Sequence, residues 1–165
     1  MNEKKIIIFS ILITITLLVG GIFFVSTSTA TPSVISSSNA KATTIDPTSA
    51  DWGQIPMFKG TVSKVFRIKN TGTNTLKLFN IRTSCHCTTA EVITPTDTSP
   101  LFKMDSLSSW IGTVDPGKEA KLTVVFDPAF HGPDAVGPIT RYVEIETNDK
   151  AEPKLTFTVT GNVYK

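Results

Sequence analysis

Residues 62–82 read VSKVFRIKNTGTNTLKLFNIR, and this stretch decides the fold. Phe66 and Ile68 are separated by one basic residue, so in an extended chain both side chains point to the same side. The Asn, Thr and Gly residues that follow are typical of a turn. A second apolar-rich run then covers residues 76–82. The stretch therefore predicts two strands joined by a turn.

Alternation of apolar and polar residues returns in the second half of the chain. A Pro-Gly pair at residues 116–117 fits the centre of a type II turn ahead of one such run. No stretch after residue 45 has a helical period, and several strands separated by turns favour an all-β fold, an antiparallel β-sandwich. The side chains predicted to lie between the two sheets are Phe66, Ile68, Leu78, Leu122, Val124, Phe126, Val143, Ile145, Phe157 and Val159.

The N-terminal residues have the pattern of a targeting signal. Lys4 and Lys5 precede a run of twenty uncharged residues, 6–25. A helix of that length spans about 30 Å, the thickness of a bilayer core, which favours a signal anchor or transmembrane helix over residues 1–25. A secretory signal cleaved after Ala30 is the alternative. Because the lysines hold the N-terminus inside, both interpretations export the rest of the chain.

Residues 26–44 contain eleven Ser or Thr residues among nineteen. Such a segment buries too little apolar surface to order itself, so we expect a flexible linker ahead of a folded domain at residues 45–165. The expected location is the cell membrane, as a single-pass protein with its domain on the extracytoplasmic side. Cleavage would instead give a secreted or periplasmic domain.

Composition argues against two classes of function. The net charge is +2 and the basic residues are scattered, so there is no electrostatic case for a nucleic-acid partner. No paired-carboxylate, phosphate-loop or His-Glu-x-x-His pattern is present. His86 and His131 are the two side chains suited to act as a general base near neutral pH. We therefore expect no catalytic residues and do not expect an enzyme.

Both cysteines lie in residues 80–92, which read NIRTSCHCTTAEV. In an extended chain Cys85 and Cys87 point to one side and His86 points to the other. A disulfide between the two cysteines requires the strand to break into a turn, so we predict none. Three interpretations stay open, namely two buried packing residues, a soft-metal site and a redox-active or strained disulfide.

A metal site would draw on soft donors. The candidate ligands for copper or zinc are Cys85, Cys87 and His131. Further soft or borderline donors in the chain are Met57, Met104 and His86. No sequence spacing brings these donors together, and apart from such a metal no cofactor is expected.

Two irregular segments interrupt the strand rhythm. One is residues 95–109, and the other is residues 127–138, which read DPAFHGPDAVGP. Loops carry binding residues more often than strands do, although a solvated connector is the alternative. An edge strand or an end loop is therefore where we expect a protein partner, in addition to a membrane contact through residues 6–25.

Several short motifs in a fixed order resemble a known family. They are Asp51-Trp52-Gly53, Val65 to Gly72, Ile81 to Thr88, Val114 to Gly117, Thr147-Asn148-Asp149 and Gly161-Asn162-Val163. Over residues 45–164 the chain resembles the exported bacterial domain-of-unknown-function family fifteen seventy-three, which is similar to ASH and major-sperm-protein-like domains. The resemblance implies an immunoglobulin-like sandwich of seven to eight strands on an exported chain, with no established activity. Residues 95–109 are an insertion relative to the family pattern.

The function expected from the sequence is an exported, membrane-anchored, non-enzymatic immunoglobulin-like module that binds a partner or serves a structural role. The alternative is soft-metal binding or thiol redox chemistry in the segment Cys85-His86-Cys87.

Overall fold

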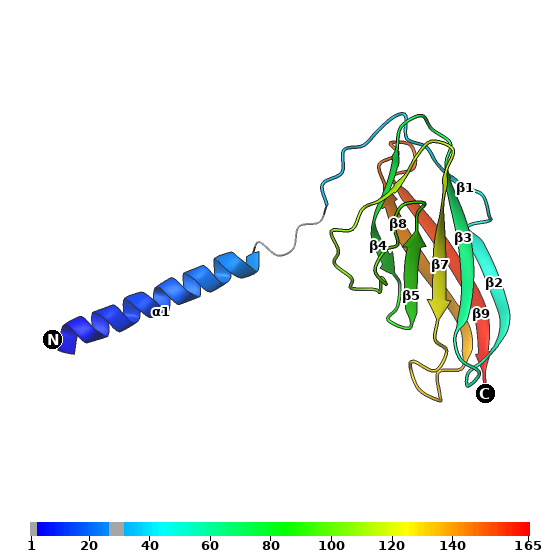
Figure 1. Ribbon diagram of the computed structural model, residues 1–165. Coiled ribbons are helices and arrows are strands. Elements are labelled where there is room, and N and C mark those ends of the chain that lie inside the picture. Colours follow the sequence, from blue (N-terminus) through cyan, green and yellow to red (C-terminus); the bar gives the residue numbers. More distant parts are fainter. Residues whose placement is uncertain (1–2, 27–31) are drawn as a thin grey trace. The chain divides into compact units, whose positions relative to one another are not determined.

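A computed structural model describes residues 3–26 and 32–165, which fall into two units divided at residue 31. The first unit contains helix α1, Glu3–Ser26 (Figure 1). In the part of the chain that the structure describes, no helix combines the length and apolar character that a membrane crossing needs. Ala30, the predicted cleavage position, lies outside the described residues.

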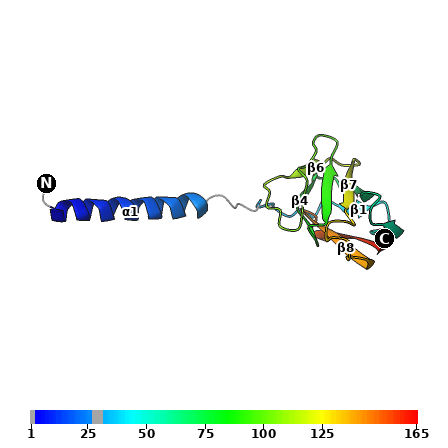
Figure 2. The ribbon, with the colours of Figure 1, turned by 90° about the horizontal axis from the view of Figure 1, so that it is seen from below.

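The second unit is a sandwich of two sheets. The strands are β1 Ala42–Thr44, β2 Ser49–Pro56, β3 Val62–Asn70, β4 Leu76–Thr83, β5 Thr88–Ile93, β6 Gly112–Val114, β7 Glu119–Phe126, β8 Gly137–Thr147 and β9 Lys154–Tyr164. One sheet has the order β1-β3-β7-β5 and the other has the order β2-β9-β8-β4-β6. Seen from below, β7 and β1 lie on one side and β8 on the other (Figure 2). The predicted all-β immunoglobulin-like sandwich is confirmed, with nine strands among the described residues and one parallel pair, β2 with β9.

The alternating residues form the core between the sheets. All ten side chains predicted for the core are buried. Phe66 on β3 and Phe157 on β9 meet across the two sheets with ring centroids 4.9 Å apart. The period-two pattern therefore identified the inward faces correctly, because each alternating strand has one face to bury.

The last residues of the expected linker, 26–44, belong to the sandwich. Ala40 and Ala42 are buried in the main core cluster, and β1 pairs with β3. The Ala42 N–H also donates to the buried carboxylate of Asp149 at 2.9 Å. The prediction was wrong for this part of the segment because small alanines and backbone hydrogen bonds can anchor a chain that has few large apolar residues.

The segment 95–109, here called the insertion because the family resemblance predicts one there, covers an edge of the first sheet. Phe102 forms a bridge with Ala90 on β5, and the Ser99 N–H donates to the Val92 carbonyl at 2.9 Å. Phe102 is buried and packs on Trp110 with ring centroids 6.0 Å apart. This insertion therefore occupies backbone groups of β5 that would otherwise be open to a further strand.

Candidate functional site

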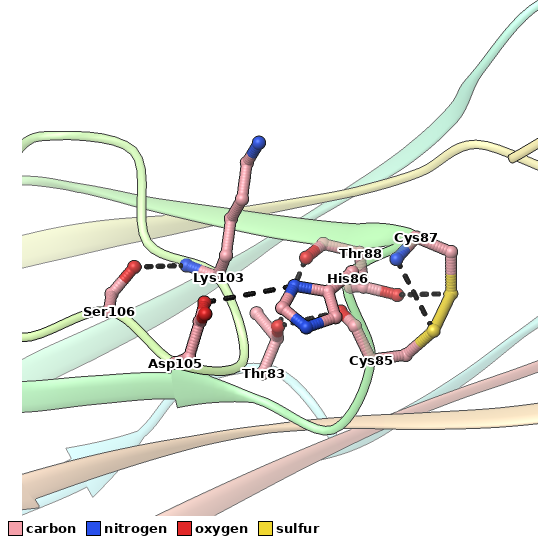
Figure 3. Close-up of polar contacts among 8 residues, drawn as sticks. All are labelled: Thr83, Cys85, His86, Cys87, Thr88, Lys103, Asp105 and Ser106. Atoms are coloured by element: carbon pink, nitrogen blue, oxygen red, sulfur yellow. Dashed lines mark hydrogen bonds and ion pairs between the residues drawn. A yellow bond between two sulfur atoms is a disulfide. The ribbon is translucent and has the colours of Figure 1, made fainter.

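The cysteines lie in a tight turn, residues 84–87, between β4 and β5. The Thr88 N–H donates to the Cys85 carbonyl at 3.1 Å, which closes the turn. The buried Thr83 hydroxyl reaches the carbonyl oxygens of Cys85 and Thr88 at 2.9 and 3.0 Å (Figure 3). Thr83 thus holds both sides of the turn from within the fold.

A disulfide joins Cys85 to Cys87, whose Cα atoms are 5.3 Å apart. The prediction of no disulfide between them was wrong. It assumed that the strand continues through the segment, whereas the chain turns here and brings the two side chains together. The Cys87 N–H also points at the Cys85 sulfur, at 3.3 Å.

An irregularity in β4 precedes the turn. The pairing of β4 with β8 shifts between Phe79 and Arg82, and Asn80 has a positive φ of 53°. The Asn80 side-chain amide donates to Glu146 at 3.1 Å. A bulge of this kind bends a strand and changes where its end points. Here it lies just ahead of the cysteine turn.

His131 comes to the disulfide from the loop 127–136. Its Nε2 atom lies 3.3 Å from the Cys85 sulfur. The loop is tied to the cysteine turn at its start, because the Asp127 N–H donates to the Cys87 carbonyl at 2.9 Å. The ring of Phe130 packs edge-on against the His131 ring, with centroids 5.0 Å apart.

Arg141 on β8 approaches the other sulfur. Its Nε atom donates to Cys87 Sγ at 3.2 Å, and its guanidinium carbon lies 5.7 Å from the centre of the Phe126 ring. The disulfide thus has an imidazole beside Cys85 and a guanidinium beside Cys87. No sequence cue identified Arg141, which is 54 positions from Cys87 and lies in an ordinary strand.

A small apolar cluster lies beneath the disulfide. Its buried members are Ile55, Met57, Cys87, Phe126 and Val163, with the half-buried Cys85 packed against it. Phe126 stacks on Trp52, with ring centroids 6.0 Å apart. Cys87 is 2% exposed, so Cys85 is the sulfur that solvent reaches more easily.

The structure brings three of the predicted metal donors together and places His86 elsewhere. Ligand atoms of Cys85, Cys87 and His131 all lie within 4.8 Å of one another. His86 is turned away from the sulfurs, with Nδ1 3.7 Å from Asp105 Oδ1 (Figure 3). Metal binding at the three converging residues stays a prediction.

The model of the family described as "Protein of unknown function (DUF1573)" matches residues 43–100, which include the cysteine turn. No curated protein matches the chain.

Solved structures resemble the sandwich. A protein of unknown function from Porphyromonas gingivalis W83 is 19% identical with a TM-score of 0.57, over 79% of this chain. The alignment covers 50% of that protein, so this chain spans about half its length. The ASH/PapD-like domain 7 of human CEP192 is 16% identical over 82% of this chain and 93% of the domain, with a TM-score of 0.45. WR4, an MSP family member from C. elegans, is 16% identical over 78% of this chain and 100% of its own length, with a TM-score of 0.39.

An immunoglobulin-like sandwich is consistent with a non-enzymatic binding module, although a fold alone does not define a function. The resemblance predicted from the sequence motifs is confirmed: residues 43–100 match the DUF1573 family and lie in an immunoglobulin-like β-sandwich.

Proposed function

We propose that the chain is an exported, non-enzymatic binding module whose interaction surface lies at one end of its sandwich. This end, here called the disulfide end, consists of residues 57–61, 84–87, 127–136 and the C-terminus of β9. The strand register places them together, since Pro56 pairs with Tyr164 and Phe126 pairs with both Val62 and Thr88. Figure 1 shows these loops at the end where the C-terminus lies.

One observation carries the proposal. The disulfide end exposes apolar side chains from three separate segments: Phe58 is 69% exposed, Phe130 51%, Val136 48% and Tyr164 44%. Scattered single apolar residues are normal on a surface, but several on neighbouring loops are typical of an interaction site.

The sheet edges are less suited to a partner. The insertion 95–109 covers β5, and the edge strands β1 and β6 are three residues long each. The remaining edge strand, β2, has an irregular register between Asp51 and Gln54. Short, covered or bulged edges discourage the addition of another strand. End loops are therefore the better candidates.

Export is the second part of the proposal. Lys4 and Lys5 ahead of the uncharged residues 6–25 support it, whether that segment stays as an anchor or is cleaved. The Cys85–Cys87 disulfide also supports it, because disulfides persist outside the reducing cytosol. Protease added to intact spheroplasts should degrade the sandwich, and complete protection until lysis would contradict export.

The interaction surface can be tested by site-specific photo-crosslinking in cells that produce the full chain. A photoreactive phenylalanine analogue at Phe58 or Phe130 should give the same crosslinked product. The matched control is Val65, an exposed apolar residue on β3 and away from the disulfide end. Equal crosslinking at Val65, or none at either phenylalanine, would refute the surface.

A second function, reversible thiol–disulfide exchange, is favoured by the contacts of the two sulfurs. A thiolate of a dithiol reductant would attack the half-buried Cys85 sulfur and release Cys87 as a thiolate. Arg141 Nε, 3.2 Å from Cys87 Sγ, would stabilise the negative charge of the departing Cys87 thiolate. The second thiol of the reductant then displaces Cys85. Two electrons and two protons pass to the protein, and the reductant becomes a disulfide.

The rate of this exchange is a direct test. Dithiothreitol should release two thiols from the folded chain, and Arg141→Met should slow the release several-fold because a less stabilised thiolate leaves more slowly. Arg82→Met is the control, since Arg82 is an exposed arginine on the neighbouring strand without a sulfur contact in the described structure. Thiol release only after unfolding, or equal rates in the two variants, would refute exchange.

A further inference from the structure

We propose that reduction turns Cys85, Cys87 and His131 into a three-ligand site for monovalent copper. The proposal rests on the thiol–disulfide exchange proposed above and names what the reduced state binds. In the oxidised state the two sulfurs are bonded to each other, so the site exists only after reduction.

The distances suit one shared ion. A trigonal ion with sulfur bonds of about 2.3 Å and nitrogen bonds of about 2.0 Å needs ligand atoms roughly 3.5–4 Å apart. Cys85 Sγ and His131 Nε2 are already 3.3 Å apart, and all three ligand atoms lie within 4.8 Å of one another. The two sulfurs must move apart, which breaking their bond allows, and Cys87 Sγ and the His131 ring must come closer together.

The ligands come from two segments that are already joined. The hydrogen bond from Asp127 N–H to the Cys87 carbonyl fixes the start of loop 127–136 against the cysteine turn. Thr83 holds the turn itself through two carbonyl oxygens. The donors therefore stay near each other when the disulfide opens, which lowers the ordering cost of binding an ion.

The donor set selects a soft ion. Two thiolates and one imidazole suit copper(I) and zinc, whereas hard cations prefer oxygen ligands. Structural zinc sites are almost always four-coordinate. Among the described residues, the group of His, Cys, Asp and Glu side chains that converges here has three members. Three ligands favour the ion that accepts a lower coordination number.

Charge favours a monovalent ion as well. Two thiolates and the Arg141 guanidinium, 3.2 Å from Cys87 Sγ, sum to a charge of about −1, and an imidazole that coordinates a metal adds none. A singly charged ion balances this set, whereas zinc would leave a net positive charge next to an arginine. The Cys87 N–H, 3.3 Å from Cys85 Sγ, is a further donor to a thiolate.

The chemistry balances in two separate steps. Reduction transfers two electrons and two protons from a dithiol to the disulfide. Binding then displaces the two thiol protons as copper enters, and copper remains in its +1 state. No electron passes between metal and protein in the binding step.

The test uses the full chain in a mild detergent, reduced anaerobically with a phosphine so that the result does not depend on dithiol exchange. After two thiols per chain have been counted, copper(I) is supplied as its acetonitrile complex against a chromogenic copper(I) chelator. We expect one copper per chain and sulfur and nitrogen neighbours in X-ray absorption. Cys85→Ser with Cys87→Ser should abolish binding.

Alanine variants of the two histidines form a test and its matched control. His131→Ala should weaken copper binding by at least about tenfold, because loss of even a residue that only orients a ligand typically costs that much. His86→Ala removes the adjacent histidine, which faces Asp105 instead, and should leave the affinity unchanged. Equal affinity of the wild type and His131→Ala would overturn the site.

The remaining outcomes separate the two proposals. Two free thiols without stoichiometric copper would overturn the metal site and leave exchange intact. Copper binding after phosphine reduction, with no thiol release by dithiothreitol, would support the site and refute exchange. Zinc bound as tightly as copper through the same three residues would overturn the assignment to a monovalent ion.

Discussion

Replacing Phe126 by alanine should both destabilise the sandwich and loosen the disulfide end. Phe126 is the last residue of β7 and is 3% exposed. Its ring stacks on Trp52 and lies beneath the Arg141 guanidinium, and it shares the small apolar cluster with Cys87. Removing the ring therefore leaves a cavity next to the buried sulfur.

The expected loss of unfolding free energy is about 3–5 kcal/mol, the usual cost of truncating a buried phenylalanine. The stacked Trp52 contact accounts for about 0.5–1.5 kcal/mol of this and the Arg141 contact for about 0.5–2 kcal/mol. With a urea dependence of about 2 kcal/mol per molar, the denaturation midpoint should fall by roughly 1.5–2.5 M. The unfolding transition can be followed by tryptophan fluorescence, because Trp52 packs next to the site of the substitution.

Phe66→Ala is the matched control for this prediction. Phe66 is equally buried but belongs to the main core, where it packs on Phe157. Both variants should lose similar stability, whereas Phe126→Ala alone should speed the release of thiols by dithiothreitol under native conditions. An unchanged midpoint in Phe126→Ala, or the same rate of thiol release in both variants, would refute the packing argument.

Three further predictions concern the fold. Replacing Cys85 and Cys87 together by serine should cost about 1.5 kcal/mol in urea denaturation, since a three-residue loop restricts the unfolded chain little. Asn70→Ala should cost at least about 2 kcal/mol, because its buried amide bonds four backbone groups that would lose their partner. The hydrogen bond from Arg67 lowers the pKa of Asp46, so its stabilisation is present above about pH 4 and lost as the pH falls through the lowered pKa. Acid titration of Asp46→Asn should accordingly show a smaller loss of stability at low pH than the wild type.

The sandwich could be predicted because its strands alternate. Every second residue is buried along β7, in the second half of β3, in the second half of β8 and in the first part of β9, and this regular burial leaves a pattern in the sequence. The segment containing Ala40 and β1 left no such pattern. Its contribution comes from small side chains and backbone hydrogen bonds, which composition does not reveal.

The candidate site was predictable only in part. Its residue types identified Cys85, Cys87 and His131 as soft donors, but the turn that joins the cysteines depends on Thr83 and on a bulge in β4. Arg141 was missed because its position next to Cys87 follows from strand pairing between distant parts of the chain. Tertiary contacts of this kind have no local signature in one sequence.

The disulfide is poorly suited to be a structural staple. A loop of three residues gains little from closure, and the main core cluster already packs the two sheets together. Yet the imidazole of His131 and the guanidinium of Arg141 both contact this one bond, and a hydrogen bond holds the loop 127–136 against the cysteine turn. A bridge kept for stability alone needs neither His131 nor Arg141 against its sulfurs. The proposed reversible opening of the bond would account for Arg141, because Cys87 must leave as an anion, and the proposed copper site would account for His131.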